Sequence, residues 1–420
     1  MIKREHFDVF INTPITGMLK AAEAVLVEEN GHLTRFAWRY TKNYLSHPHS
    51  FPLDPVQLPL SQQETELTCN AGIPGILDDY LPDDWGRKIL STLAFYREGK
   101  PLNRYSCIDM LNLLGSGRIG ALCWVPKNKE PTYSLGNPIG KMHDAEAIAQ
   151  TIDQPIHGDS GFDELSLLYL ANAGSGVGGA RPKALLYDEQ GAYLAKFNRR
   201  QGDDYNNART ELACLLMAKA AGLCVFTGRV VEGINAREVL LLNRFDIAHT
   251  KANDAQHYHH IITVNALLKE HTSQRDRGGV FRYDDIAALI KQYSCKVEED
   301  LEQLLRIMLF NTGINNNDTH ERNFSFIASE HGYHLAPAYD MVPSLEKGAY
   351  PVAGFQYSPV PPAINKINQY GKVFGLSKPR VKAIAQEVLT ALTQWEHFAR
   401  SAGVSTEDIA KIQGVLKISL

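Results

Sequence analysis

The sequence contains no long apolar run and no paired-cysteine motif. No stretch reaches the roughly 18 consecutive apolar residues that a membrane-spanning helix needs, and the segment from Met1 to His6 lacks the apolar core of a secretory signal. The six cysteines are scattered without a C-x-x-C pair, and several lie inside apolar segments, as is typical of reduced, packed thiols. These absences argue against a membrane protein or a disulfide-rich secreted one, and we expect a cytoplasmic protein.

A strong excess of charge is also missing. The 43 basic and 47 acidic residues leave a formal net charge of −4, which gives no bulk attraction to nucleic acid or to an anionic membrane. We therefore expect neither direct nucleic-acid binding nor membrane association. The chain does have length, because 420 residues with 44% hydrophobic content can bury a sizeable core and exceed one typical domain. Two or three domains are expected.

Two familiar motifs are present only in part. Glycines in the segment 115–120 match G-x-G-x-x-G, but a helix-like segment precedes them and a strand-like segment follows. A dinucleotide-binding turn needs the opposite order, so we expect a tight turn there. The histidines of the segment 257–260 have neither cysteine partners nor an H-E-x-x-H pattern, which disfavours zinc.

The residues with the clearest chemistry lie between 311 and 341. Phosphoryl transfer depends on positioning and charge neutralisation more than on covalent catalysis. Asp318 could orient and deprotonate an attacking hydroxyl, while Asn323 and Asp340 could offer the oxygen ligands that Mg²⁺ prefers. The order of an aspartate, an asparagine and a second aspartate favours a phosphate-transferring site.

A predicted hairpin would bring the two metal ligands together. Residues 324–328 and 333–336 are expected to pair as antiparallel strands around a turn, so that Asn323 and Asp340 lie side by side. Asn and Asp in loops more often serve the turn itself by bonding to their own backbone. We favour that second interpretation for the segment 315–317.

A possible phosphate-binding region precedes this site. The glycine-rich segment 174–180 lies ahead of a predicted hairpin over 183–197, and glycines allow backbone N–H groups to approach phosphate oxygens closely. A flexible loop would have the same composition. Lys196 lies on the second strand, and Glu211 lies near the start of a helix predicted over 207–221. Protein kinases hold their phosphate-binding lysine with such a glutamate, although a solvent-facing lysine and a surface acid are the plainer alternatives.

The order of elements predicts two lobes. A strand-rich part with the glycines and the lysine is followed by a mostly helical part. The helices are predicted near 284–293, 297–311, 378–399 and 406–418. A nucleotide would lie between the lobes, with Asn243, Arg244 and Phe245 as the connector beside its purine. His320 and Arg322 would steady the transferred phosphate.

With these motifs assembled, the chain resembles the HipA family of serine/threonine kinases, which are the toxins of bacterial toxin–antitoxin pairs. The similarity runs over nearly the whole length. The motifs that carry it are Leu81-Pro-Asp-Asp-Trp-Gly-Arg87, Gly117-Arg-Ile-Gly-Ala121, Gly178-Gly-Ala-x-x-Lys183, Arg244-Phe-Asp246, Asn317-Asp-Thr-His-Glu-Arg-Asn323-Phe-Ser and Pro337-Ala-Tyr-Asp340.

The resemblance implies an α+β, two-lobed, protein-kinase-like fold. It would comprise a strand-rich N-terminal domain (1–140), a β-rich nucleotide-binding lobe (141–246) and an all-helical catalytic lobe (247–420). By the same resemblance, Asp318 would be the catalytic acid/base, and Asn323 and Asp340 would bind Mg²⁺. The residues expected around the ATP are Gly178, Gly179, Ala180, Lys183, Lys196, Glu211, Asn243, Arg244, Phe245, His320, Arg322 and Tyr339.

The activity implied is ATP- and Mg²⁺-dependent phosphorylation of hydroxyls on cellular proteins, aminoacyl-tRNA synthetases among them, which slows growth. A small helix-turn-helix antitoxin would restrain the toxin. Two residues depart from the family pattern: Gly176 replaces a serine whose phosphorylation silences many members, and Arg181 replaces a glutamine. Self-inactivation through this loop is therefore not expected, and the added charge of Arg181 could change the substrate or the reaction.

Two other functions fit the same residues. One is a Mg²⁺-dependent phosphodiester hydrolase, in which Arg181 and Arg322 would help activated water to attack a nucleic-acid backbone. The other is a pseudokinase that binds a partner without turnover. A hydrolase has no need of Lys196 and Glu211, and a pseudokinase has no need of a complete metal-binding set, so the kinase is favoured.

Overall fold

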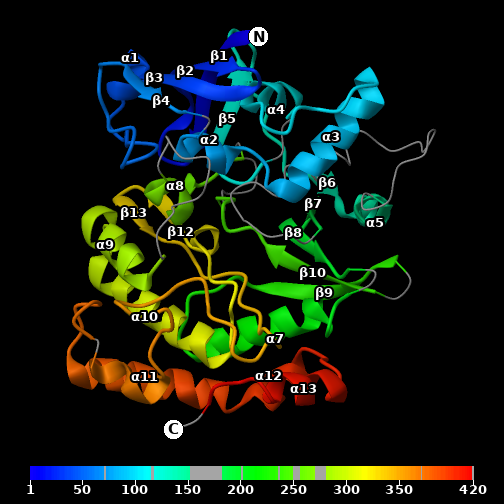
Figure 1. Ribbon diagram of the computed structural model, residues 1–420, viewed down its shortest axis with the longest axis vertical. Coiled ribbons are helices and arrows are strands. Elements are labelled where there is room, and N and C mark those ends of the chain that lie inside the picture. The colour runs from blue at the N-terminus through cyan, green and yellow to red at the C-terminus, as the bar shows by residue number, and fades with distance from the viewer. Residues whose placement is uncertain are drawn as a thin grey trace.

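The computed structural model describes residues 1–70, 72–114, 118–151, 182–199, 202–234, 237–248, 256–269, 281–369 and 371–418. These residues form three sheets and their covering helices, with the N-terminal sheet at one end of the long axis and the other two sheets side by side in the middle (Figure 1). The N-terminus lies at one end of that axis and the C-terminal helices lie at the other. None of the described helices is long and apolar enough to cross a membrane.

The N-terminal unit, residues 2–126, is built on an antiparallel sheet of order β4-β3-β2-β1-β5. Its strands are β1 (Ile2–Thr13), β2 (Gly17–Glu29), β3 (His32–Tyr40), β4 (Thr65–Thr68) and β5 (Leu122–Pro126). Its helices are α1 (Lys42–Leu45), α2 (Gly75–Tyr80), α3 (Asp84–Glu98) and α4 (Cys107–Leu113). The sequence predicted only short strands here. That prediction was wrong for β1 and β2, of 12 and 13 residues, because their solvent-facing polar residues break up the apolar pattern.

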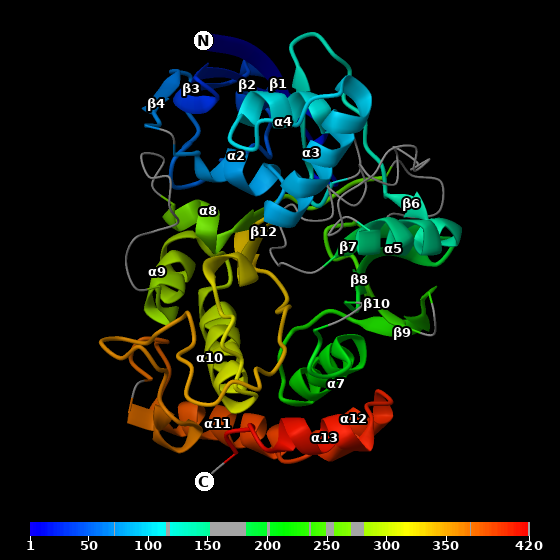
Figure 2. The same ribbon diagram turned by 45° about the vertical axis from the view of Figure 1, so that its right-hand side comes forward.

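The second sheet, called the central sheet here, has the order β6-β7-β8-β10-β9. Its strands are β6 (Asn137–Pro138), β7 (Lys183–Asp188), β8 (Gly191–Phe197), β9 (Gly228–Glu232) and β10 (Glu238–Asn243). The hairpin predicted over 183–197 is confirmed as β7 and β8, and the predicted helix is α7 (Asn207–Ala220). Helix α7 runs beneath this sheet, and η1 (Ile139–Lys141) and α5 (Met142–Thr151) lie beside β7 (Figure 2).

The C-terminal lobe, residues 256–418, is not all-helical. It contains a three-stranded sheet of β11 (Ile261–Thr263), β12 (Ser325–Ser329) and β13 (Gly332–Leu335). The predicted hairpin is confirmed as β12 and β13, with Phe326 opposite Leu335. The remaining elements are α8 (Val264–Leu268), α9 (Tyr283–Tyr293), α10 (Val297–Gly313), η3 (Glu321–Asn323), η4 (Ile364–Gln369), α11 (Lys378–Leu392), α12 (Trp395–Ser401) and α13 (Thr406–Gln413).

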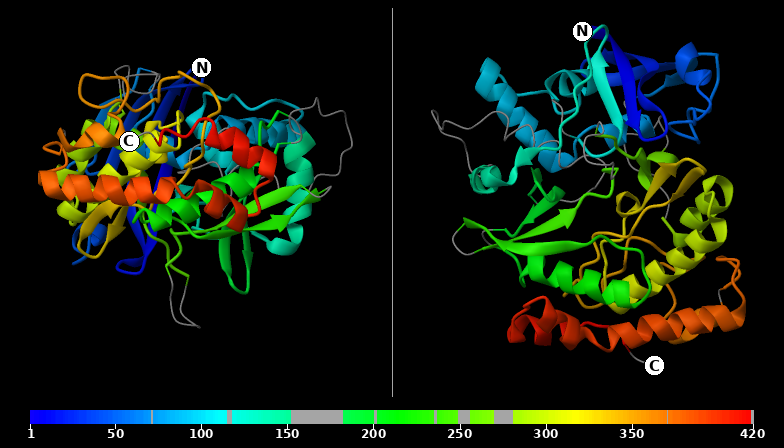
Figure 3. Two further views of the ribbon diagram at one scale, coloured as in Figure 1. Left: turned by 90° about the horizontal axis from the view of Figure 1, so that it is seen from below. Right: turned by 180° about the vertical axis from the view of Figure 1, so that it is seen from behind.

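The helix predicted over 378–399 is two helices, α11 and α12. The break falls at Gln394, whose backbone leaves the helical region (φ −96°, ψ 19°). The next residue, Trp395, is fully buried, and its indole N–H donates to the carbonyl of Ile409 (3.2 Å). Burying this large side chain and satisfying its N–H outweighs the helix propensity of the segment. Helices α11 to α13 form one layer across the end of the molecule (Figure 3).

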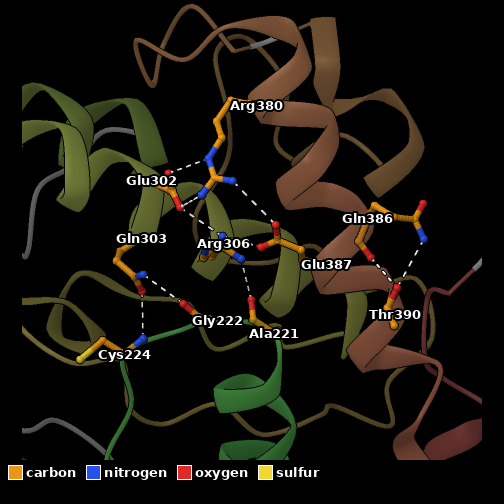
Figure 4. Close-up of polar contacts among 10 residues, drawn as sticks. All are labelled: Ala221, Gly222, Cys224, Glu302, Gln303, Arg306, Arg380, Gln386, Glu387 and Thr390. Carbon is orange, nitrogen blue, oxygen red and sulfur yellow. Dashed lines mark hydrogen bonds and ion pairs between the residues drawn. The ribbon is translucent and has the colours of Figure 1, made fainter.

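A buried arginine ties this layer to the rest of the lobe (Figure 4). Arg306 of α10 donates to the carbonyl of Ala221 at the end of α7 (2.8 Å). It also forms ion pairs with Glu302 (3.1 Å) and with Glu387 of α11 (2.6 Å). One side chain therefore fixes the relative positions of α7, α10 and α11.

Candidate active site

The central sheet and the C-terminal lobe meet at Lys196. This lysine lies on β8, and its Nζ donates to Glu211 Oε1 on α7 at 2.7 Å and is ion-paired with Asp340. The side chains of Lys196 and Glu211 are buried. Burial opposes the charge on the lysine, but Asp340 and Glu211 raise the pKa of Lys196 above its usual value, so it stays protonated. The strand lysine and helix glutamate thus form a buried pair.

The loop after α10 links the predicted site residues Asp318, Asn323 and Asp340, and Asn316 makes two of the connections. The Asn316 Nδ2 donates to the carbonyl of Asp340 (3.2 Å), and its Oδ1 accepts from the backbone N–H of Asp318 (3.1 Å). Asn323 Nδ2 donates to the carbonyl of Asp318 (2.5 Å). Asn316, Asn323 and Asp340 also line one cleft. Asn316, predicted only to serve a turn, is therefore a buried link between the predicted site residues.

Asn323 and Asp340 provide the chemistry that a hard cation requires. Among the described residues, Asn323 Oδ1 is buried without a hydrogen-bond partner. A buried acceptor without a donor is costly, whereas Mg²⁺ binds such amide and carboxylate oxygens. Burial would raise the pKa of the Asp340 carboxyl, but Lys196 and Lys183 hold that pKa below its ordinary value, so the carboxylate is ionised. The residues present fit a magnesium site.

Asp340 also has an unusual backbone. Its φ is +53°, in the left-handed region that residues other than glycine seldom adopt. Such conformations cost about 1–3 kcal/mol and persist where the surrounding structure fixes them. Here the hydrogen bond from Asn316 fixes the backbone carbonyl of Asp340, and the ion pair with Lys196 fixes its side chain.

Asp318 differs from the other two in its exposure. Its side chain is 74% exposed, and its Oδ1 lies 3.7 Å from His320 Nε2. An exposed carboxylate at the rim of a buried site can be reached by a hydroxyl on a large substrate. His320 lies where a positive charge could assist at that rim.

An apolar cleft lies next to Lys196. Its lining residues are Ile119, Leu194, Lys196, Phe226, Leu242, Asn243, Arg244, Phe245, Asp246 and Tyr339. The rings of Phe226 and Phe245 are 4.5 Å apart, and those of Phe226 and Tyr339 are 5.8 Å apart. Flat apolar walls beside a buried lysine suit a purine attached to phosphates. Sequence reasoning missed Ile119, although it lies within the motif of residues 117–121, and Phe226, which lies in a segment without a motif.

The predicted connector residues play different parts. Asn243 is exposed, and its Nδ2 donates to Thr227 Oγ1 (2.8 Å). The Arg244 guanidinium is buried and bonds to the Asp246 carboxylate and to the carbonyl of Arg118 (2.7 Å). Its predicted contact with the purine is therefore limited to lining the cleft, because the charged group anchors the connector to the N-terminal unit.

Two predicted phosphate-binding residues also reach the N-terminal unit. The guanidinium of Arg322 is ion-paired with Asp78 of α2 (2.7 Å), and Lys183 Nζ lies 3.4 Å from Asp83 Oδ2 at the start of α3. A phosphate contact by Arg322 would have to share this ion pair. The predicted loop residues Gly178, Gly179 and Ala180 lie outside the described residues, as do Gly115, Gly117, Gly176 and Arg181.

A strand lysine held by a helix glutamate, facing an acid, an amide and a second acid on another lobe, defines a two-lobed, protein-kinase-like fold. Residues 175–396 match the HipA-like C-terminal domain, and residues 10–124 match the HipA N-terminal domain. The chain belongs to the HipA family.

Two known proteins show how far the likeness extends. A Sinorhizobium fredii (strain NBRC 101917 / NGR234) protein named "Putative kinase Y4mE" is 27% identical over 144 residues, which are 34% of this chain and 33% of that protein. The match thus spans about a third of that relative. A chain of the Shewanella oneidensis MR-1 toxin–antitoxin complex of HipA, HipB and operator DNA has a TM-score of 0.67 at 17% identity, covering 97% of this chain and 94% of that one. This second likeness establishes the fold.

Proposed function

We propose that the protein is an ATP- and Mg²⁺-dependent serine/threonine-protein kinase that acts as the toxin of a HipA-type pair. The observation that carries the proposal is the buried bridge of Lys196 between Glu211 and Asp340. This bridge lies between a flat apolar cleft and a cleft lined by Asn323 and Asp340. A nucleotide lying across both would have its base against Phe226 and its phosphates at Lys196.

Each of the site residues would have a separate role in the reaction. Lys196 would bind the phosphates and be held in place by Glu211. Asn323 and Asp340 would bind Mg²⁺, which supplies positive charge to the phosphate oxygens when bound. Asp318 would accept a hydrogen bond from the substrate hydroxyl and take up its proton.

The substrate is proposed to be a cellular protein with an accessible serine or threonine, such as an aminoacyl-tRNA synthetase. The exposed carboxylate of Asp318 supports a macromolecular substrate, since a buried base would admit only a small one. The antitoxin partner is proposed to be a small helix-turn-helix protein, supported by family membership and by the HipB that accompanies the Shewanella HipA.

Phosphate transfer from γ-labelled ATP into a cell extract tests the proposal. Asp318→Asn should lower the labelling by about 100-fold or more, because it removes the base but keeps the side-chain shape. Asp144→Asn, an exposed change on α5, is the matched control and should label like wild type. Equal labelling by Asp318→Asn and wild type would overturn the kinase assignment. Cutting of plasmid that requires Mg²⁺ and Asp318 without ATP would establish the hydrolase instead.

A further inference from the structure

Asp78, on α2 of the N-terminal unit, has an unusual set of partners. Its side chain is 3% exposed, and one oxygen, Oδ2, accepts from Arg322 (2.7 Å), Lys269 Nζ (2.7 Å) and Asn265 Nδ2 (3.1 Å). Arg87 lies 3.8 Å from the other oxygen. Burial opposes ionisation, but the charges of Arg322 and Lys269 hold the pKa of Asp78 well below its usual range. The carboxylate is therefore charged at neutral pH.

Arg322 connects this carboxylate to the proposed metal ligands on both sides. It directly precedes Asn323 in the short helix η3. Its carbonyl accepts a hydrogen bond from the hydroxyl of Tyr339 (2.8 Å), which directly precedes Asp340. Arg322 therefore contacts the segments that carry both proposed metal ligands, while its guanidinium is bound by Asp78 of the N-terminal unit.

Helix α2 packs so closely on the C-terminal lobe that the position of its carboxylates is fixed relative to that lobe. A Cβ added at Gly75, the first residue of α2, would lie 2.1 Å from the carbonyl oxygen of Ala266 in α8. Asp79, the neighbour of Asp78, accepts from both the backbone N–H and the hydroxyl of Thr263 (2.6 Å each). Helix α2 therefore lies in backbone contact with the C-terminal lobe, and its carboxylates have little freedom to move.

From this arrangement we infer that Asp78 is a positioning residue for the magnesium site. Through Arg322 it would hold Asn323 and Asp340 at the relative positions that binding of one cation requires. This inference rests on the proposed function, since it takes those two residues as the metal ligands. Residues that orient metal ligands from outside the coordination shell typically affect metal affinity by about 10–100-fold. The N-terminal unit would then contribute to activity without contacting either substrate.

The test measures metal affinity without turnover. Thermal melts of the full chain are recorded with saturating AMP-PNP, a non-hydrolysable ATP analogue, while Mg²⁺ is titrated. The readout is the apparent Mg²⁺ dissociation concentration, called the Mg²⁺ midpoint here, which is obtained by fitting the rise in Tm to its logarithmic dependence on Mg²⁺ concentration. Asp78→Asn should raise this concentration by about 10–100-fold. A general loss of stability would lower every Tm and leave that midpoint where it is.

Asp79→Asn is the matched control, because it alters the next carboxylate of the same helix, which bonds to Thr263. Asp79 also acts on Arg322 through its charge, but the two make no direct ion pair, so the Mg²⁺ midpoint of Asp79→Asn should shift far less than that of Asp78→Asn. An equal rise in both variants would overturn the inference in favour of general docking, and no rise in Asp78→Asn would overturn it outright. Absence of a Mg²⁺-dependent Tm rise in the wild type would instead remove the metal site, and the proposed kinase with it.

A second variant covers the event that Asp78→Asn fails to fold, since it leaves the buried Lys269 with fewer partners. Arg322→Gln removes the other end of the ion pair and should raise the Mg²⁺ midpoint similarly. In the double variant the two effects should not add, because both break the same contact. Full additivity would show that Arg322 acts independently of Asp78 and would overturn the inference.

Discussion

Lys196 neutralises the buried carboxylate of Glu211 and the half-buried carboxylate of Asp340, so its loss should lower stability as well as activity. Lys196→Met would keep most of the side-chain volume but remove the positive charge that Glu211 and Asp340 share. Removing one partner of a buried ion pair costs about 3–5 kcal/mol. We expect a loss of that size in the free energy of unfolding, measured in urea. Lys219→Met, which changes an exposed lysine of α7, should have little effect, and equal losses would contradict the argument.

Asp54 gives a prediction about pH. It is fully buried, its Oδ1 accepts from the N–H groups of Val56 and Gln57, and its Oδ2 has no hydrogen-bond partner among the described residues. Burial raises the pKa of Asp54 from 3.8 to about 6. A carboxyl with a raised pKa contributes stability that is complete below the unfolded value and is lost as the pH rises through the folded one.

Asp54→Asn stays neutral at every pH and should therefore gain on the wild type as the pH rises from 4 to 7. Because one pKa unit corresponds to about 1.4 kcal/mol, the gain in unfolding free energy should approach roughly 3 kcal/mol. Urea unfolding of both proteins at several pH values checks this. A difference that does not change with pH would show that Asp54 is ionised throughout.

At this scale, the sequence predicts residues whose partners are close along the chain. Asp318, Asn323 and Asp340 could be identified because one loop and one hairpin carry them. The Asp78 partner of Arg322 and the Arg118 carbonyl that Arg244 binds could not, because they lie in distant segments of the chain. Nothing in local composition shows that a predicted phosphate-binding arginine is paired across the molecule.

Among the elements, the end of α7 is closely packed against α10. Gly222 follows this helix with φ +79°, and a Cβ there would lie 2.7 Å from the Nη1 of buried Arg306 (Figure 4). Gly222→Ala should therefore combine backbone strain of about 1–2 kcal/mol with an overpacking cost of about 1–3 kcal/mol. Denaturant unfolding of the purified variant measures the sum.

Gly99, at the end of α3, separates the two contributions. Its φ of +68° is similar, but an added Cβ would meet no described atom within 4 Å. Gly99→Ala should lose only the strain of about 1–2 kcal/mol. Equal losses in both variants would mean that Arg306 yields to the new methyl group.

Elements were predictable where turns and caps are local. The β7–β8 and β12–β13 hairpins follow from their turn residues, and α7 ends just before a glycine with positive φ. The division between α11 and α12 was not predictable, because it depends on the burial of Trp395 against the C-terminal helices. Tertiary packing overrides helix propensity there.

Over the whole molecule, the central sheet belongs to two hydrophobic cores. Leu240 faces a core shared with α7 and the C-terminal lobe, while its neighbour Leu241 faces a core shared with the N-terminal unit. Adjacent strand residues point to opposite faces, so one sheet separates and joins both cores. The division at residues 140 and 246 stays a prediction, and this packing argues that the parts unfold together.

The four tryptophans allow that cooperativity to be measured. Trp38, Trp85 and Trp124 lie in the N-terminal unit, so Trp395→Phe leaves fluorescence that reports on this unit alone. Leu240→Ala in that background removes a buried side chain from the other core and should cost about 2–5 kcal/mol. If the shared sheet couples the cores, the fluorescence midpoint in urea should fall together with the far-UV circular dichroism midpoint. A fluorescence midpoint that stays constant while the dichroism midpoint falls would mean that the N-terminal unit folds independently, and the long-range hold of Asp78 on Arg322 would then depend on docking between separately stable parts.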